Sequence, residues 1–418
     1  MRNTICIFED AGYTKLLPLV WMRGVYELKT GIYSLMDKII RKYPGTKINL
    51  FVREYLEEIS AERHPYCSIN PKINDDCLFI NGRFILQNPI PVDGPEEMGI
   101  INDTVVYLRL TRDNAQKVSS GAMLAKNMKN TLVKKIPSLK IVKMDGILIT
   151  YFWDLIKNNS EQLIAEFKSL TKGNEIKGQI YENTVLLNKD NIYIGKNTKI
   201  KPGVVIDAED GPVYISDDVL VEPNAVIQGP AFIGNRTIVR LGAKIRLNTS
   251  IGEVCRVGGE IEDTIIHSYS NKQHDGFLGH AYVGMWCNFG AGTTNSDLKN
   301  NYSNIKVFVE GKLMDSGSMF IGLIMSDHSK AAISTVFNSG TVVGVSSNIF
   351  GEGFPPKFIP SFSWGAIKSK HIYRPEDAIE TAQKVMARRK KQLSKAEAGL
   401  LKHIFESTKK ERKIMLYV

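Results

Sequence analysis

The stretch VYISDDVLVEPNAVIQGPAFIGNRTIVRLGAKIRLNTSIGEVCRV, residues Val213–Val257, places an aliphatic residue at every sixth position. The repeated residues are Ile215, Val221, Ile227, Ile233, Val239, Ile245, Ile251 and Val257. This period matches neither a helix nor an ordinary strand, and internal repeats of this kind predict a parallel β-helix. Each hexapeptide supplies one short strand and a turn, so the stacked coils of the resulting prism bury a continuous aliphatic column.

The same rhythm extends outward in both directions. Before an insertion, AEDGPVY, it runs through Ile194, Ile200 and Ile206. Towards the C-terminus it slips at GGEIEDTIIHSYSNKQHDG, resumes through Phe277, Val283 and Phe289, and breaks at SDLKNNYSNIKV before returning at Ile321, Ile333, Ser339 and Val345. Because breaks in a solenoid mark protruding loops, and such loops are commonly functional, we expect binding residues at these two interruptions.

The segments on either side of the prism have different patterns. Towards the N-terminus, TICIFED, INLFV, CLFINGRFIL, TVVYLRL and ILITYFW predict strands, and GIYSLMDKIIRKY and REYLEEISAE predict helices. This alternation predicts an α/β domain with a mostly parallel sheet. WDLIKNNSEQLIAEFKSLTKG predicts a helix that ends at Gly173 and leads into a polar connector. After the prism, PEDAIETAQKVMARRKKQLSKAEAGLLKHIFES predicts one long helix with Pro375 in its first turn.

Composition limits the class of protein. No stretch approaches the roughly 18 apolar residues that span a bilayer, and acidic residues in the opening MRNTICIFEDAGY disfavour a signal peptide. The five cysteines are dispersed, as reduced and buried thiols would be. Much of the net charge of +10 lies in the C-terminal tail, which indicates a solvated helical face or phosphorylated substrates. We therefore expect a cytoplasmic protein with neither nucleic acid nor membrane as a partner.

Several motifs carry a resemblance that covers nearly the full length of the chain. They are LLPL with Arg23, FINGR, SNKQHDGFLGH, NFGAGTTNSDLKNNY and FPPKFIPSFSWG. With these motifs, the chain resembles bifunctional N-acetylglucosamine-1-phosphate uridyltransferases/glucosamine-1-phosphate acetyltransferases, in an alternative bacterial form. The resemblance implies a nucleotidyltransferase-like, Rossmann-like α/β domain, a left-handed parallel β-helix and a C-terminal helix. The expected boundaries are 1–160 for the first domain, 161–186 for a linker helix and connector, 187–372 for the prism and 373–418 for the terminal helix.

In the prism, the resemblance implies an acetyl transfer from acetyl-CoA to an amine. Such a transfer needs a base and donors for an oxyanion. By alignment with the family, His274 is the base, Glu260 is the carboxylate that polarises it, and Asn288 and Ala291 line the sugar and the thioester. The alternative for His274 is a solvated loop histidine. His280 and His328 are weaker candidates, since either fits a coil-turn residue with a satisfied hydrogen bond.

The chain also departs from the family around the acceptor. Phe277 replaces a tyrosine that contacts the substrate phosphate, Glu262 replaces a lysine, and Asp297-Leu298 replaces an Asn-Tyr pair. A carboxylate beside a phosphate is unfavourable, so either another cation substitutes or the acceptor differs. The available cations are Lys244, Arg246, Lys272 and Lys299. We expect Phe277, Ala291, Asp297 and Lys299 to contact the coenzyme or the sugar.

In the N-terminal domain, the family's glycine-rich phosphate loop is absent. The first strand is followed by FEDAGYTKLLPLVWMR, with Gly12 as its only glycine. The resemblance implies that Lys15, Arg23, Lys29 and Asn81 bind the nucleotide and the sugar phosphate, and that Asp103 ligates Mg²⁺. The alternatives are solvated surface cations and a domain that retains the fold without the activity.

Together these features predict a homotrimeric enzyme with two activities. It would acetylate an amino-sugar 1-phosphate with acetyl-CoA and transfer a nucleotidyl group from UTP or another nucleoside triphosphate, with UDP-N-acetylglucosamine as the product. One alternative keeps a single activity, a nucleotidyl transfer or an acyl transfer on a different sugar. Another is a non-catalytic trimeric scaffold or regulatory subunit.

Overall fold

The computed structural model describes residues 4–366 and 370–417. The chain divides into two compact units, Met1–Leu28 with Tyr33–Tyr151, and Lys29–Ile32 with Phe152–Val418. Among the described residues, no helix combines the length and apolar character needed to cross a membrane. All five cysteines are free, and four of them are buried, while Cys67 is partly exposed.

The first unit is built on a sheet of strand order β3-β2-β1-β4-β7-β6-β8. The strands β1, β2, β3 and β4 are parallel, whereas β7 runs antiparallel to β4 and β6, and β8 is parallel to β6. Their bounds are β1 Thr4–Phe8, β2 Lys47–Phe51, β3 Ser68–Ile69, β4 Cys77–Asn81, β6 Glu97–Ile101, β7 Thr104–Leu110 and β8 Lys140–Lys143. The predicted α/β domain with a mostly parallel sheet is confirmed.

Short helices and one minor ladder complete this unit. The α-helices are α1 Leu35–Ile40, α2 Glu57–Arg63, α3 Arg112–Ala115, α4 Ser120–Met123 and α5 Met128–Lys135, and the 3₁₀ turns are η1 Ala11–Leu16, η2 Val25–Glu27 and η3 Glu54–Leu56. β5 Phe84–Ile85 pairs with β9 Ile147–Leu148. The predicted strand ILITYFW is therefore right only at its start, because a helix, α6, begins at Phe152.

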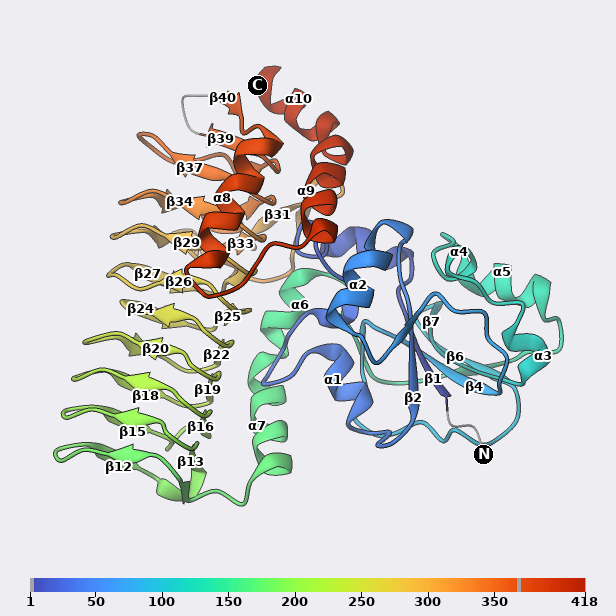
Figure 1. Ribbon diagram of the computed structural model, residues 1–418, viewed down its shortest axis with the longest axis horizontal. Helices are drawn as coiled ribbons and strands as arrows, with labels where there is room; N and C mark the ends of the chain where they lie inside the picture. Colours follow the sequence, from blue (N-terminus) through green and yellow to red (C-terminus); the bar gives the residue numbers. More distant parts are fainter. Residues whose placement is uncertain (1–3, 367–369, 418) are drawn as a thin grey trace. The chain divides into compact units, whose positions relative to one another are not determined.

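The second unit is a parallel β-helix, whose strands stack coil upon coil in Figure 1. One face holds β10 Glu175–Ile176, β13 Ile192–Ile194, β16 Val213–Ile215, β19 Ala231–Ile233, β22 Thr249–Ile251, β25 Ile265–Ile266, β28 Tyr282–Val283, β33 Ile324–Met325, β36 Val342–Val343 and β38 Phe358–Ile359. A second holds β11 Gln179–Ile180, β14 Lys199–Ile200, β17 Leu220–Val221, β20 Ile238–Val239, β23 Arg256–Val257, β26 Asn271–Lys272, β29 Asn288–Phe289, β34 Lys330–Ala331, β37 Asn348–Phe350, β39 Ser363–Ala366 and β40 Lys370–Ile372. The third holds β12 Val185–Leu187, β15 Val205–Asp207, β18 Val226–Gln228, β21 Lys244–Ile245, β24 Glu260–Glu262 and β27 Phe277–Gly279.

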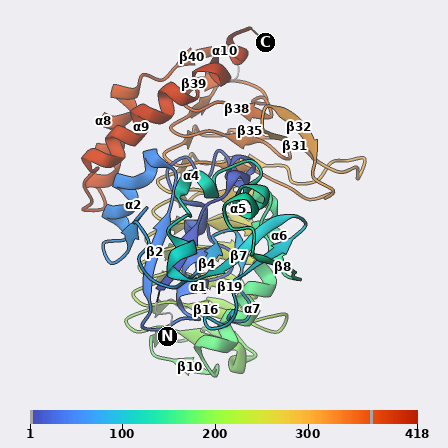
Figure 2. The same cartoon turned by 90° about the vertical axis from the view of Figure 1, so that its right-hand side faces the viewer.

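The hexapeptide rhythm accounts for the core of this prism. Ile215, Ile227, Ile233, Ile245 and Ile251 are all fully buried in one aliphatic cluster that runs through the coils. The second interruption leaves β30 Thr294–Asn295, paired with β35 Val336–Phe337, and a hairpin of β31 Lys306–Val309 and β32 Lys312–Asp315, labelled in Figure 2. The predicted β-helix is confirmed.

Three expectations about the elements and their boundaries need correction. The prism begins at β10 rather than at residue 187, because β10, β11 and β12 already pair with the next coil. The C-terminal segment is three helices rather than one: α8 Pro375–Ala387, α9 Lys395–Ser407 and α10 Lys409–Tyr417. Likewise, the predicted linker helix is α6 Phe152–Lys157 followed by α7 Asn159–Leu170. The turn η4, Lys189–Asn191, lies between the first coils.

Candidate functional site

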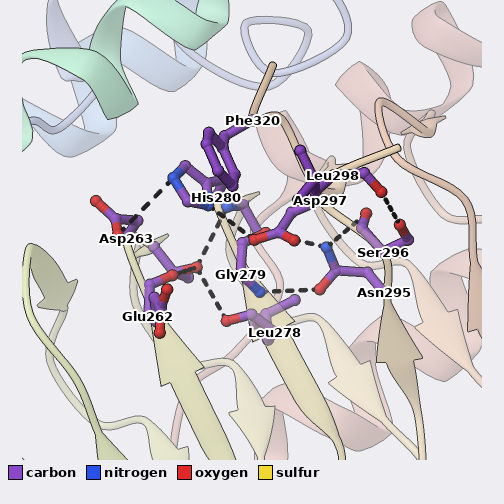
Figure 3. A network of polar contacts seen from close by, with 12 residues as sticks. Glu262, Asp263, Leu278, Gly279, His280, Asn295, Ser296, Asp297, Leu298 and Phe320 are labelled. Atoms are coloured by element: carbon purple, nitrogen blue, oxygen red, sulfur yellow. Dashed lines mark hydrogen bonds and ion pairs between the residues drawn. The ribbon is translucent and has the colours of Figure 1, made fainter. Parts of the chain in front are cut away.

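Polar side chains gather on the prism where the coils before and after the first interruption meet (Figure 3). Nδ1 of His280 lies 2.8 Å from Oδ2 of Asp297, and its Nε2 lies 3.8 Å from Oδ2 of Asp263. The imidazole also stacks on Phe320, with ring centroids 5.0 Å apart. This group, which we call the His280 cluster, brings together residues from three coils and the protruding segment.

The coil repeat itself builds the His280 cluster. Successive coils place Asp263, His280 and Asp297 one above the other, and the backbone N–H of His280 donates to the carbonyl of Glu262 on the preceding coil. Gly279 leaves the necessary space. A Cβ at this position would lie 2.4 Å from the ring of Phe277 and 2.5 Å from the carboxylate of Asp297.

Arg246 lies at the edge of the same cluster. It is one of the four cations that the sequence offered in place of the family lysine. Its guanidinium forms ion pairs with Glu262 and, at 3.3 Å, with Glu260. Burial raises the pKa of the Glu262 carboxyl, while Arg246 opposes this rise and Asp263 adds to it. Arg246 is thus a cation that lies beside Glu262, the residue that aligns with the family lysine.

The geometry of His280 favours a structural role over that of a base. Both ring nitrogens face carboxylates, one of them within hydrogen-bond distance, and Phe320 stacks on the imidazole plane. A general base needs a nitrogen lone pair that the reacting amine can reach. His280 therefore holds the coil corner and the protruding segment together.

His274 has the opposite surroundings. Its side chain is exposed, and within the described residues its imidazole makes no hydrogen bond. It lines a shallow hollow of about 440 Å³ together with Ala291, Gly292 and Gly259. The structure brings His274 and Ala291 together, as the sequence predicted. It does not bring Glu260 to His274, because Glu260 pairs with Arg246 instead.

Two backbone features complete this hollow. The N–H of Ala291 has no hydrogen-bond acceptor among the described residues, so it is available to a carbonyl oxygen. Beneath His274, the buried Lys272 donates from Nζ to the carbonyl oxygens of His274 and Gly258. Burial lowers the pKa of Lys272 to about 8. Lys272 therefore fixes the turn that carries His274.

The other predicted prism residues lie apart from this hollow. Asn288 faces a different pocket on the second face, beside Asn271 and Lys330. Phe277 pairs in register with Glu260, and its ring lies beside Gly279 next to the His280 cluster, to which Asp297 belongs. Lys299 donates to the carbonyl of Asn304 at 2.6 Å and therefore ties the protruding loop to itself.

In the first unit, two buried ion pairs occupy the carboxyl end of β1. The guanidinium of Arg83 binds Asp10 through two hydrogen bonds of 2.7 and 2.6 Å. Arg53 binds Glu9 in the same way, through two bonds of 3.0 Å, and also donates to the carbonyl of Arg23. Ligands of open α/β sheets bind outside the carboxyl ends of the strands, so these pairs lie where a nucleotide is expected.

Gly12 and Asn81 support the Asp10–Arg83 pair. A Cβ at Gly12 would lie 2.4 Å from the Arg83 guanidinium, so only glycine fits there. Asn81 is fully buried, and its amide donates to Asp10 and to the carbonyl of Val105, while its oxygen accepts from the N–H of Arg83. Asn81 was predicted to bind the nucleotide, but its side chain forms its hydrogen bonds within this internal network.

The predicted cations of this region differ in exposure. Lys15 is partly exposed and lies 5.4 Å over the ring of Tyr151. Arg23 is only 2% exposed, so it is not a solvated surface cation. Lys29 lies in the short segment that belongs to the second unit, where its N–H donates to the hydroxyl of Tyr282.

The residues that the structure describes do not form a metal site of the expected kind. Asp103 lies in the tight turn between β6 and β7 with φ +63°, where aspartate is a favoured residue, and it pairs with Lys129. No group of three or more histidine, cysteine, aspartate or glutamate residues is arranged to hold a metal among them. Glu9 and Asp10 form ion pairs with Arg53 and Arg83, so these carboxylates do not fit a Mg²⁺ site.

Sequence reasoning missed Arg53, Arg83, Asp263 and Phe320. For Arg83 a signal existed, since FINGR places an arginine directly after a buried strand whose neighbour ends in Glu9-Asp10. For Asp263 the signal was its spacing, because it precedes His280 by the same interval as His280 precedes Asp297. Phe320 carries no comparable signal, since it follows a loop of irregular length.

A nucleotidyltransferase-type α/β unit followed by a hexapeptide prism defines the class of this protein. Residues 5–175 match the family model described as "Sugar nucleotidyl transferase". The resemblance stated from the sequence motifs is thereby confirmed for the first unit.

Curated relatives extend the similarity across both units. A "Bifunctional sugar-1-phosphate nucleotidylyltransferase/acetyltransferase" from Sulfurisphaera tokodaii is 23% identical over 314 residues, 68% of this chain and 75% of its own length. The "Bifunctional protein GlmU" of Methanococcus vannielii is 26% identical over 82% of this chain and 85% of its own, and that of Methanocaldococcus jannaschii 28% over 79% and 86%. The chain is thus a relative of enzymes that combine two transferase activities.

Among solved structures, a hexapeptide transferase family protein from Anaplasma phagocytophilum is similar over 51% of this chain and 92% of its own. The sequence identity is 16% and the TM-score 0.21. A likeness this distant adds nothing on function.

Proposed function

We propose that the chain catalyses two transfers on amino-sugar phosphates. The prism acetylates glucosamine 1-phosphate with acetyl-CoA, and the N-terminal unit transfers a uridylyl group from UTP, so that UDP-N-acetylglucosamine is the product. The observation that carries this proposal is a nucleotidyltransferase-family unit on the same chain as a prism with an exposed histidine in a hollow. The curated relative from Sulfurisphaera tokodaii, whose name combines two such activities, supports it.

In the acetyl transfer, the amine nitrogen of the sugar attacks the thioester carbonyl. His274 accepts the proton that the amine loses. The N–H of Ala291 donates to the carbonyl oxygen as negative charge develops there. Gly292, with φ +72°, lets the coenzyme approach the backbone closely. Collapse of the tetrahedral intermediate expels the thiolate of coenzyme A, which takes up a proton, and leaves the amide.

Arg246 is the basic residue that we assign to the substrate phosphate. It is half-exposed and sits between Glu260 and Glu262. Asp297 and Phe277 shape this side of the site through the His280 cluster.

In the nucleotidyl transfer, the sugar phosphate oxygen attacks the α-phosphorus of UTP and pyrophosphate leaves. Lys15, partly exposed in η1 after β1, is the cation that we assign to the phosphates.

A second candidate function is acyl transfer alone. The observation that favours it is the engagement of Glu9 and Asp10 by buried arginines at the carboxyl end of β1. In that case the N-terminal unit retains the fold without the reaction.

Two partial reactions test the proposal. One follows thiol release from acetyl-CoA with glucosamine 1-phosphate, and the other follows pyrophosphate release from UTP, N-acetylglucosamine 1-phosphate and Mg²⁺. We expect both, and His274→Ala should lower the first by about 10²–10⁴-fold and leave the second unchanged. The matched control is His403→Ala, an exposed histidine of α9, which should alter neither. Full thiol release by the His274→Ala protein would refute the base assignment, and absent pyrophosphate release would leave acyl transfer alone.

A further inference from the structure

A second pocket lies between the second face of the prism and the end of α8. Its volume is about 260 Å³. It is lined by the cations Arg256, Lys330, Arg388 and Arg389 and by the amides of Asn271 and Asn288. Neither the predicted base His274 nor any residue of the His280 cluster lines it.

The strand register creates this polar surface. Arg256 of β23 pairs with Asn271 of β26, which pairs with Asn288 of β29, which in turn pairs with Lys330 of β34. These residues occupy the same position on four successive coils, so their side chains form one outward column. Arg389 reaches this column from the segment after α8, donating from Nη2 to Oδ1 of Asn271 at 3.0 Å.

The charges in the pocket are unbalanced. No acidic residue lines it, and in the described part of the chain none of its four cations lies within ion-pair distance of a carboxylate. Burial lowers the pKa of Lys330 to about 8. Burial, together with the like charges of Arg256 and Arg388, lowers the pKa of Arg389. Four converging cations repel one another, and a bound anion would relieve that repulsion.

The wall of the pocket is rigid. Tyr269 and Trp286 stack with ring centroids 4.4 Å apart, and Met386 of α8 packs on them in a buried cluster. Lys330 is anchored by a bond of 2.7 Å from Nζ to the carbonyl of His328. Two of the four cations, Lys330 and Arg389, are thus held by hydrogen bonds before any ligand arrives.

We propose that this pocket, which adjoins the His274 hollow through the shared lining residue Gln273, binds the phosphate groups of a small molecule. The planar guanidinium groups match phosphate oxygens in bidentate geometry, and the amides of Asn271 and Asn288 supply neutral donors. A pocket of this size suits one or two phosphates, whereas a nucleic acid would need a continuous basic groove. The site does not depend on the proposed function.

Calorimetric titration of the full chain with inorganic pyrophosphate tests this site. The Arg256→Gln/Arg389→Gln variant should bind pyrophosphate about tenfold or more weakly than the wild type, because two charge-assisted contacts are lost. The Arg256→Lys/Arg389→Lys variant keeps the charge and should lose less. Arg236→Gln is the control, since Arg236 lies outside the pocket in an exposed pair with Glu253. Any pyrophosphate bound by the N-terminal unit is common to all of these proteins.

A parallel titration with ADP distinguishes a nucleotide ligand from a free phosphate or diphosphate. Tighter binding of ADP than of pyrophosphate, lost in the Gln variant, identifies a nucleotide, and the reverse order identifies a free phosphate or diphosphate. Should the double variant not fold by circular dichroism, Arg388→Gln replaces it, because Arg388 is exposed. Equal affinity of wild type and pocket variants for both probes, or no binding at millimolar concentration, overturns the proposal.

Discussion

Lys272 is the residue whose place in the structure differs most from its expected use. The sequence offered it as a free cation for a substrate phosphate. It instead pairs with Val257, whose side chain lies in the aliphatic core, and is 2% exposed. A lysine at a position that is otherwise aliphatic in this column escapes prediction, because its long stem lets Nζ reach two backbone carbonyls at the coil corner.

The lowered pKa of Lys272 predicts a dependence of stability on pH. Between about pH 8 and 10.5 the unfolded chain holds a proton that the folded chain has lost, so the free energy of unfolding rises with pH. Below about pH 8 both states are protonated and the cost of burying the charge is constant. The gain across this window is on the order of 3 kcal/mol.

Lys272→Met should therefore lack this gain. The measurement is urea unfolding at pH 7.5 and pH 10, with the exposed Lys244→Met as the matched control. Lys330, whose pKa is also lowered, contributes equally to all three proteins. An identical rise in stability in the Lys272→Met and wild-type proteins would contradict this interpretation.

The candidate site was predicted in part from the sequence. His274 and Ala291 were placed correctly in one hollow, because a motif aligned them. The pairing of Glu260 with His274 was not found, since the side chain of Glu260 reaches Arg246 across the coil below. Side-chain direction of this kind depends on the neighbouring coils and cannot be read from spacing alone.

At the scale of elements, the six-residue period predicted the prism because each hexapeptide buries one aliphatic side chain in the same way. Every inward aliphatic residue from Ile215 to Val257 is buried, as the register requires. The first coil was missed because its residues are less buried. Ile176, which pairs with the core residue Ile194, is exposed at 37%, so the end of the solenoid lacks the contrast between inward and outward positions.

The C-terminal segment was mispredicted although its signal was present. Ser394 caps α9, accepting from the N–H of Glu397, while the Glu397 side chain accepts from the N–H of Ser394. This capping box marks a new helix start. The long basic run ARRKKQ obscured it, because arginine and lysine are good helix formers and suggest continuity.

At the scale of the whole molecule, we propose that the chain forms a homotrimer through its prism. The resemblance to hexapeptide acyltransferases motivates this proposal, with acyl sites between neighbouring subunits. Sedimentation at concentrations where the chain is active should give the mass of three chains of 46.8 kDa. A monomer that retains acetyl transfer would exclude shared sites.

The central claim is that one chain carries both transfers. The most direct measurement supplies glucosamine 1-phosphate, UTP, Mg²⁺ and acetyl-CoA labelled with ¹³C in its acetyl group, and follows the nucleotide sugar by mass spectrometry. We predict UDP-N-acetylglucosamine that carries the label, none when acetyl-CoA is omitted, and about 10²–10⁴-fold less when His274 is replaced by alanine. Labelled N-acetylglucosamine 1-phosphate that accumulates without any nucleotide sugar would contradict the claim and leave the prism as the sole active unit.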